Sequence, residues 1–192
     1  MPAMNTTLRY GSVAMTLHWL IAAAIIVNIF VGLYMGDLPR EAPSTFEIFA
    51  LHKSIGLAVL ALSVLRVVWW LVNPIPPSPS GLARWMKIAG KAAHYLFYFL
   101  IVAIPLAGWL MVSVGSMGHP TSVFGLFDWP SFPILADIPR SAGRPYHEAF
   151  ETIHVLLAWG AIVLILLHVG AALYHQFIRK DQLISRMWYG KA

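Results

Sequence analysis

The 192-residue sequence contains no cysteine. Without thiols the chain cannot form disulfides, ligate an iron–sulfur cluster or bind haem covalently through thioether bonds. Charge is also scarce, since Asp, Glu, Lys and Arg make up only 11% of the residues, against about 25% in a typical soluble domain. These absences exclude disulfide-rich secreted domains, iron–sulfur proteins and c-type cytochromes.

Apolar residues dominate the composition. They make up 59% of the sequence, and the mean hydropathy is +0.71. Runs long enough to cross roughly 30 Å of hydrocarbon lie at about 13–35, 48–72, 92–114 and 149–178, with an extracytoplasmic loop at about 115–147. Because these spans use up nearly the whole chain, we expect one all-α membrane domain over residues 1–192, a four-transmembrane-helix bundle without a separate soluble domain.

The distribution of charge predicts the orientation of this bundle. Four spans put both termini on one side, which carries nine basic residues and a single acid, Asp181; the other side carries four basic residues and seven acids. By the positive-inside rule, both termini are cytoplasmic. The net charge of +5 and the pI of about 9.7 then indicate a basic collar at the membrane surface and no nucleic-acid partner.

Four histidines lie on or beside the last span, at His147, His154, His168 and His175. A spacing of 14 residues on an α-helix returns to within roughly 40° of the same face and advances roughly 21 Å. His154 and His168 are therefore predicted to face one way at two depths. An imidazole in hydrocarbon needs partners for both ring nitrogens, so this pair indicates two ligand sites.

Histidines in the other spans match these two depths. Because the helices alternate in direction, His18 and His94 are predicted at the depth of His168, and His52 at the depth of His154. Haem iron takes two axial ligands on opposite faces of the porphyrin, and imidazole is a good donor to iron. We therefore expect an outer site made by His52 with His154, and an inner site made by His168 with either His18 or His94.

Two glycines follow histidines at the same 14-residue spacing. Gly32 follows His18 by 14 residues and Gly108 follows His94 by 14, which predicts room for a flat macrocycle on those faces. Pro105 lies inside the third span and is expected to kink it.

A permanent cation is predicted on the face of His52. Arg66 follows His52 by 14 residues, so it lies about 21 Å further along the same side of the helix. It either pairs with a haem propionate or extends to the cytoplasmic headgroups.

Four motifs together resemble the prokaryotic cytochrome b561 family: LHW at His18, HKSIG at His52, AHYLFY followed by Pro105 and Gly108, and ETIH…LLHVGAALYHQFIRKD from Glu151 to Asp181. The similarity covers all four predicted spans, and the paired histidines of the last span are its most specific part. The family is related to the di-haem membrane subunits of nickel–iron hydrogenases and formate dehydrogenases. Among its members, the chain is most similar to the stand-alone superoxide oxidases, which pass electrons from superoxide to ubiquinone.

The resemblance implies two non-covalent haems b and a quinone site. It pairs His18 with His168 on the inner haem iron and His52 with His154 on the outer haem iron. It also places His94 and His175 near the inner haem edge, where the family binds quinone. His175 lies seven residues past His168, about 10 Å nearer the cytoplasmic surface, where it can exchange a proton with quinone.

The expected activity is electron transfer across the bacterial inner membrane. Electrons from an extracytoplasmic donor, superoxide, pass the small residues Ala158 and Ala161 and reach ubiquinone near the cytoplasmic side. Lys53, Arg140 and Arg144 are candidate outer contacts for an anionic donor. The outer side is acidic overall, which argues against strong long-range steering of an anion.

Three alternatives follow from the same residues. The chain could be the haem-bearing membrane anchor of a hydrogenase or dehydrogenase, reduced by a docked redox protein, or a non-redox proton or metal transporter lined by histidines. His147 could replace His154 as outer ligand, although this stretches the distance to the level of His168 to roughly 31 Å. His119 is interpreted as a surface residue of the outer loop, and a dimer is compatible with the sequence.

Overall fold

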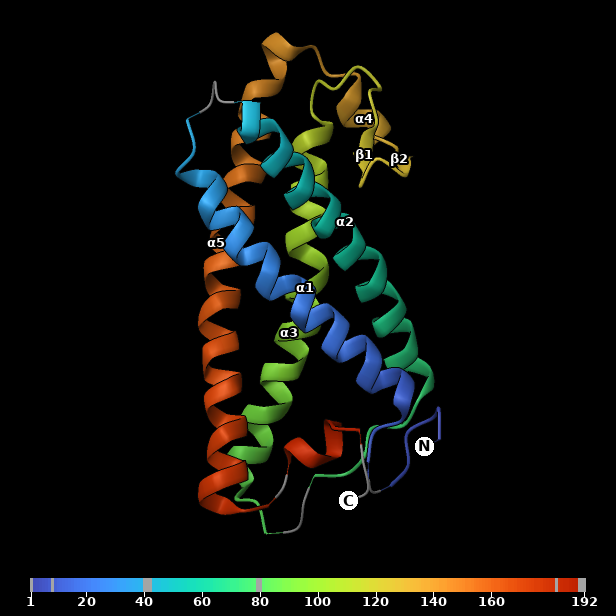
Figure 1. Ribbon diagram of the computed structural model, residues 1–192, viewed down its shortest axis with the longest axis vertical. Helices are drawn as coiled ribbons and strands as arrows, with labels where there is room; N and C mark the ends of the chain where they lie inside the picture. The colour runs from blue at the N-terminus through green and yellow to red at the C-terminus, as the bar shows by residue number, and fades with distance from the viewer. Residues whose placement is uncertain (1, 8, 40–42, 79–80, 182, 190–192) are drawn as a thin grey trace.

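The computed structural model describes residues 2–7, 9–39, 43–78, 81–181 and 183–189. Four long helices dominate it (Figure 1): α1 (Ser12–Gly36), α2 (Pro43–Val72), α3 (Arg84–Ser113) and α5 (Arg140–Leu173). Each contains an apolar window long enough to cross a membrane. The protein is a helical membrane protein with four transmembrane helices, as the sequence predicts.

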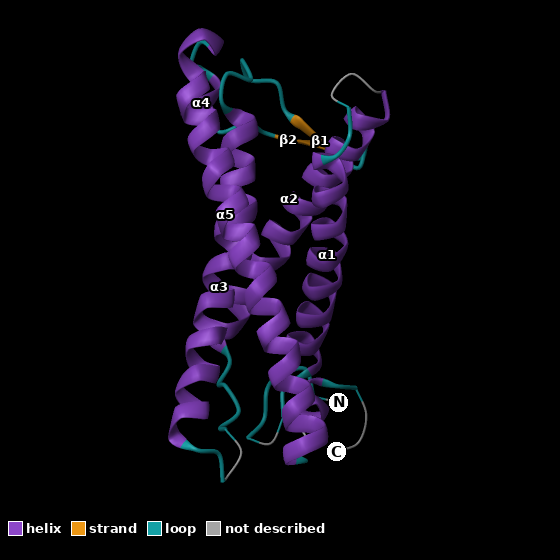
Figure 2. Ribbon diagram, turned by 90° about the vertical axis from the view of Figure 1, so that its left-hand side faces the viewer, coloured by secondary structure: helices purple, strands orange, loops and turns teal. Residues whose placement is uncertain are grey.

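The helices are arranged as two packed pairs. Both termini lie at the same end of the molecule (Figure 1). α1 packs on α2 and α3 packs on α5, and a contact between α2 and α3 joins the pairs. Among the described residues, α5 makes at most slight contact with α1 and with α2. Figure 2 shows α3 and α5 side by side, with α1 on the opposite side of the molecule.

Three helices begin earlier than the hydropathy predicts. α2 begins at Pro43 and not near 48, α3 at Arg84 and not near 92, and α5 at Arg140 and not near 149. A hydropathy window detects only the part of a helix that lies in hydrocarbon. The backbone stays hydrogen-bonded as it passes through the headgroup region, so charged residues such as Lys87 and Lys91 belong to the helix.

The outer connection is more ordered than the loop predicted over 115–147. It contains a two-stranded antiparallel hairpin, β1 (Thr121–Val123) and β2 (Phe127–Trp129), and the short helix α4 (Pro133–Ala136). Phe124 and Gly125 both have positive φ, at 51° and 70°, and they form the tight turn between the strands. The last part of the predicted loop belongs to α5. Secondary-structure propensity does not indicate this hairpin, because each of its strands is only three residues long.

Hydrogen bonds fasten this outer connection to the ends of α2 and α3. The backbone N–H of Phe124 donates to Ser54 Oγ at 3.0 Å, and that of Phe132 donates to Ser113 Oγ at 2.9 Å. The Trp109 indole N–H donates to the Pro130 carbonyl at 2.9 Å. The connection therefore lies against the bundle.

The inner end is closed by both chain termini. After α5 the helix widens into a π-helical turn, Tyr174–Arg179, and a short 3-10 helix follows at Ile184–Met187. The Trp19 indole of α1 donates to the Met187 carbonyl at 2.8 Å, and Arg9 donates to the Trp188 carbonyl at 2.8 Å. The carboxyl-terminal segment is thereby held against the start of α1.

Several small polar residues are fully buried, and many large apolar ones are exposed. Ser54, Ser63 and Ser113 are fully buried together with Met15, whereas Phe30 and Leu166 are each 68% exposed. Lipid tails are as apolar as leucine, so membrane helices associate through small residues and not by burying large apolar ones. The many exposed apolar side chains agree with a bundle surrounded by lipid.

Replacing Ser54 by alanine should loosen the hairpin from α2. The change removes the acceptor of the Phe124 N–H, a bond worth about 1 kcal/mol. We expect faster hydrogen–deuterium exchange across residues 121–129, with the rest of the protein unchanged. Ser122→Ala is the matched control, because the Ser122 side chain is exposed on the same hairpin. Equal exchange in the two variants would contradict this role of Ser54.

Candidate functional site

Two imidazoles face each other at the outer level of the bundle. The ring centroids of His52 on α2 and His154 on α5 are 6.1 Å apart, with the ring planes at 75°. His154 Nδ1 lies 2.9 Å from the Ile104 carbonyl oxygen of α3, so it carries the hydrogen and Nε2 keeps its lone pair. His52 Nδ1 is buried and has no hydrogen-bond partner in the described part of the chain. The structure thus brings together the outer pair that the spacing predicts.

Two glycines make room for these rings. A Cβ atom at Gly32 of α1 would lie 3.0 Å from His52 Cε1, and one at Gly108 of α3 would lie 3.2 Å from both Cε1 and Nδ1 of His154. Both distances are shorter than ordinary van der Waals contact. The 14-residue spacing predicts room for a macrocycle at these positions, and in the structure imidazole rings approach them.

At the inner level, His168 of α5 has two histidine neighbours. Its ring centroid is 6.4 Å from that of His18 on α1 and 6.0 Å from that of His94 on α3. His94 is exposed, and its Nδ1 lies 2.6 Å from the Gly90 carbonyl of its own helix. His94 approaches His168 across the packed contact of α3 with α5, whereas His18 faces it between helices that scarcely touch.

The geometry of the pairs fits a metal that brings most of its own ligands. An imidazole nitrogen lies about 2 Å from a first-row metal, so two rings on opposite sides of one ion have centroids about 6 to 6.5 Å apart. The separations of 6.1 Å for His52 with His154, 6.4 Å for His18 with His168 and 6.0 Å for His94 with His168 all fall in this range. No group of three or more His, Cys, Asp or Glu side chains among the described residues could hold a metal ion. Iron in a porphyrin needs only two such axial ligands, so these residues fit haem.

A half-buried cation lies close to the inner pair. Arg66 Nη1 lies 3.4 Å from the Ala14 carbonyl oxygen of α1, and the guanidinium carbon is 5.8 Å from the centroid of the Tyr98 ring of α3. Arg66 takes part in none of the ion pairs among the described residues. It therefore contacts protein groups inside the bundle and has no carboxylate there to balance its charge.

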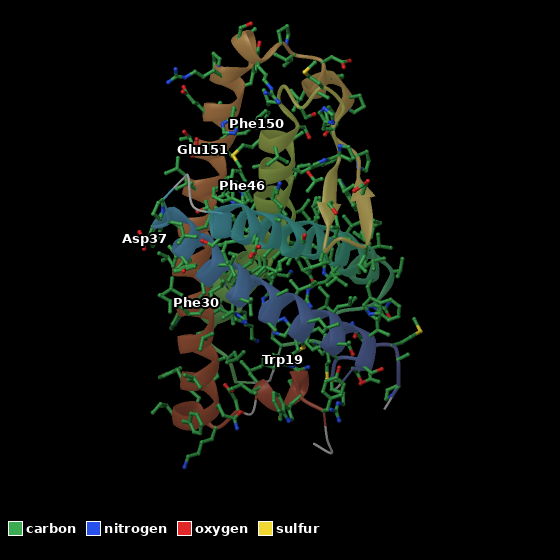
Figure 3. All side chains as sticks on the ribbon, turned by 45° about the horizontal axis from the view of Figure 1, so that its top comes forward. Trp19, Phe30, Asp37, Phe46, Phe150 and Glu151 are labelled. Atoms are coloured by element: carbon green, nitrogen blue, oxygen red, sulfur yellow. The ribbon has the colours of Figure 1, made fainter. Side chains whose placement is uncertain are left out.

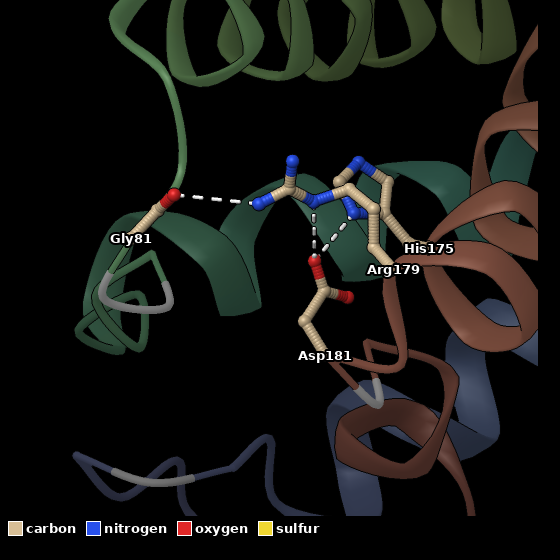
Figure 4. Close-up of polar contacts among 4 residues, drawn as sticks. All are labelled: Gly81, His175, Arg179 and Asp181. Atoms are coloured by element: carbon tan, nitrogen blue, oxygen red, sulfur yellow. Dashed lines mark hydrogen bonds and ion pairs between the residues drawn. The ribbon is translucent and has the colours of Figure 1, made fainter.

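A histidine–aspartate pair lies at the inner surface, where α5 ends. His175 Nδ1 is 2.6 Å from Asp181 Oδ2, and Arg179 Nε lies 3.3 Å from the same oxygen (Figure 4). Arg179 also donates to the Gly81 carbonyl at 3.3 Å. The two side chains of the pair are only 14% and 17% exposed. They form a closed polar cluster at the end of the histidine stripe.

The candidate outer cations lie on two helices and differ in their contacts. Arg144 Nε is paired with Glu148 at 2.7 Å on the exposed start of α5, and Arg140 Nε donates to the Gly115 carbonyl at 3.4 Å. Lys53 is half-buried on α2, next to His52. Figure 3 shows the acids Asp37, at the end of α1, and Glu151, on α5, on the same side of that view. Two of the three cations thus have other partners, a carboxylate for Arg144 and a backbone carbonyl for Arg140.

Two further histidines lie outside the opposed pairs. His147 is exposed on the first part of α5, with Nδ1 4.0 Å from the Glu151 carboxylate, and the ring that faces His52 is that of His154. His119 is exposed in the outer connection, where its carbonyl accepts a hydrogen bond from Ser131 Oγ at 2.7 Å.

Sequence reasoning missed two polar residues near the site. In the sequence Asp181 stands out only as the one acid on the basic side, and an acid isolated in this way indicates a specific partner. Asn28 of α1 lies near Gly56 of α2, and its Oδ1 atom is buried without a hydrogen-bond partner in the described residues. A single amide within an apolar span is the pattern that would have indicated it.

Comparison with known proteins identifies the family. The model of the prokaryotic cytochrome b561 family matches residues 9–190. The chain belongs to this family. It is therefore a membrane electron-transfer protein that uses haem b, and a non-redox transporter is no longer supported.

Curated relatives extend over nearly the whole chain. Cytochrome b561 homolog 2 of Escherichia coli strain K12 is 34% identical over 183 residues, covering 95% of this chain and 93% of the relative. A protein named "Probable superoxide oxidase CybB" in Yersinia pestis is 26% identical, covering 93% and 95%. One named "Probable Ni/Fe-hydrogenase B-type cytochrome subunit" in Rhizobium leguminosarum bv. viciae is 23% identical, covering 91% and 83%. Two of these names specify a role, one as a superoxide oxidase and the other as a hydrogenase cytochrome subunit.

Adding a methyl group at Gly108 should disturb haem binding. Gly108→Ala pushes against the His154 ring at a backbone position that cannot move far inside α3. We expect a lower ratio of haem b to polypeptide, measured by the pyridine haemochrome spectrum of the purified protein. Gly90→Ala is the control on the same helix, because nothing lies within 4 Å of its added Cβ. Full haem content in the Gly108 variant would show that the imidazole does not need this space.

Proposed function

We propose that the protein is a di-haem quinone reductase of the bacterial inner membrane that takes electrons from superoxide at its outer side. One haem b would be held by His52 and His154, and the other by His18 and His168. The observation that carries this proposal is the presence of two opposed imidazole pairs, each with one ring from α5. Bound haem would supply a one-electron carrier at each level.

Helix packing favours His18 over His94 as the inner ligand. A flat macrocycle needs a space between its two axial ligands that no helix contact fills. α1 and α5 leave such a space, since they make at most slight contact among the described residues, whereas α3 and α5 pack directly together. His94 would then lie beside the inner haem, with its Nε2 available to a quinone.

Arg66 fits the role of a partner for a haem propionate. A guanidinium within the bundle is costly unless an anion accompanies it, and no carboxylate among the described residues does so. Its contacts with the Ala14 carbonyl and the Tyr98 ring hold it near the inner pair. Extension to the headgroups would leave those contacts unmade.

Small residues separate the two levels on α5. Ala158 and Ala161 lie between His154 and His168, and Ala161 is only 7% exposed. Side chains of this size keep the interior narrow and dry without filling the space beside the helix. A path between carriers at the two levels would thus be short and shielded from water.

The charge distribution supports a direction for this path. The end that carries both termini has nine basic residues and one acid, so it is assigned to the cytoplasm. The His18, His94 and His168 cluster, with His175 beyond it, would then be the quinone end. The His52 and His154 pair would be the end that accepts electrons.

Superoxide is favoured as donor by the similarity to the Yersinia pestis protein over nearly its whole length. Lys53 and Arg140 are the outer cations available to a small anion, since Arg144 is paired with Glu148. Docking of a redox protein is the second candidate. It is favoured by exposed apolar side chains on the outer connection, Met117, Leu126 and Ile134, which are 73% to 81% exposed.

Stopped-flow spectroscopy of the purified protein separates the two donors. We expect superoxide to reduce the haem b within the mixing experiment, superoxide dismutase to abolish this reduction, and added ubiquinone to reoxidise the haem. If superoxide has no effect while an iron–sulfur subunit co-purifies with the protein, the complex-subunit role is correct. Failure of ubiquinone to reoxidise the haem would remove the proposed acceptor.

Single alanine variants test the haem ligands. Each of His18→Ala, His52→Ala, His154→Ala and His168→Ala should lose one of two haems, because iron is left with one axial ligand. His94→Ala should keep both haems and show altered quinone reduction. The measurement is haem b per polypeptide, with the low-spin optical spectrum as a second readout. Loss of a haem in His94→Ala with full content in His18→Ala would exchange their roles.

A further inference from the structure

His175, Arg179 and Asp181 form a cluster of polar contacts at the inner end of the molecule. We propose that Asp181 is a positioning residue that holds the His175 imidazole as the proton donor to the quinone being reduced. This inference rests on the proposed function, since it places quinone reduction at the inner end. It adds a role for a carboxylate that lies outside the histidine stripe.

The backbone is shaped to bring Asp181 back to His175. The helix widens into the π-helical turn Tyr174–Arg179, and Lys180 then adopts a left-handed conformation with φ of 57°. As a result the Asp181 N–H donates to the His175 carbonyl at 3.2 Å, while the Asp181 carboxylate meets the His175 ring. A lysine in the left-handed region is uncommon, and here it turns the chain so that Asp181 comes back to His175.

The carboxylate is held from a second direction. Arg179 Nε donates to Asp181 Oδ2 at 3.3 Å, and its other nitrogen donates to the Gly81 carbonyl of the connector before α3. Figure 4 shows the three side chains and this carbonyl joined in one chain of contacts. Asp181 is the single acid on the side of the protein that carries nine basic residues. The Asp181 carboxylate is therefore held by specific partners and does not act as a free charge on the protein surface.

This arrangement assigns different tasks to the two ring nitrogens. Nδ1–H donates to the carboxylate at 2.6 Å, which fixes the tautomer and the orientation of the ring. Nε2 is then the nitrogen that gives and regains a proton. Because the two side chains are mostly buried, the pair lies inside the protein surface and not in open water.

The proton chemistry balances as follows. One quinone takes two electrons, which the outer donor supplies as two superoxide anions become two dioxygen molecules, and two protons. Each proton leaves Nε2 of His175 as an O–H bond forms on a quinone oxygen. The imidazole regains it from water at the inner surface. Asp181 is not consumed, because its carboxylate only keeps Nδ1–H in place.

Asp181→Asn in the haem-loaded protein tests the assignment, with Asp128→Asn on the exposed outer hairpin as the matched control. We expect kcat for quinone reduction to fall about tenfold or more, with KM for quinone within about twofold, because a general acid is impaired while the binding site remains. Haem content and the rate of haem reduction by superoxide should stay unchanged. Asp181→Glu keeps the charge and should recover part of kcat.

The double variant distinguishes a role through His175 from a structural one. In a His175→Gln background, Asp181→Asn should cause no further loss, since the ring that it positions is absent. An equal loss in both backgrounds, or an unchanged kcat in Asp181→Asn, would overturn the proposal. Should Asp181→Asn fail to assemble, an Asp181→Glu variant no faster than His175→Gln would overturn it too. Failure of the proposed function would appear separately, as wild-type haem that ubiquinone does not reoxidise.

Discussion

An imidazole ring placed in hydrocarbon must find partners for both of its nitrogens, and the rest of this structure depends on that requirement. α5 places His154 and His168 on one face at two levels, and the rings opposite come from α2 and α1. The outer ring of α5 uses a backbone carbonyl of α3 for Nδ1, which leaves Nε2 directed to another partner. In the proposed function, a haem iron between each pair would satisfy the remaining nitrogens, which would account for polar rings in an apolar bundle.

The packing of the helices serves this arrangement. α1 with α2 and α3 with α5 form two close pairs, while the histidine pairs connect helices that scarcely touch among the described residues. Glycine at 32 and 108 lets neighbouring helices approach the outer imidazoles without a Cβ in the way. Buried serines then hold the outer connection, and the two termini close the inner end. Stability and cofactor space thus come from different helix contacts in the same bundle.

The two ends of the molecule have different chemical character. The outer end carries acids, a paired Arg144 and an exposed apolar connection, which suits a small donor or a docked protein better than a strongly attracted anion. The inner end is basic and contains a buried His175–Asp181 pair beyond the inner histidines. In the proposed function, electron entry would require only access to the outer level. Quinone reduction would also require protons, and the His175–Asp181 pair at the inner end is the group proposed to supply them.

Much of this organisation is encoded in local sequence. Hydropathy determined the number of spans, and the 14-residue spacing in the last one determined that two histidines face one way at two depths, because both properties follow from helix geometry alone. The tertiary structure decided the rest. It brought the Ile104 carbonyl to His154, placed glycines of α1 and α3 against rings of other helices, formed the three-residue strands of the hairpin, and turned the chain at Lys180 so that Asp181 meets His175. These features depend on how helices cross and on how a short segment reverses, and neither is recorded in the periodicity of a single chain segment.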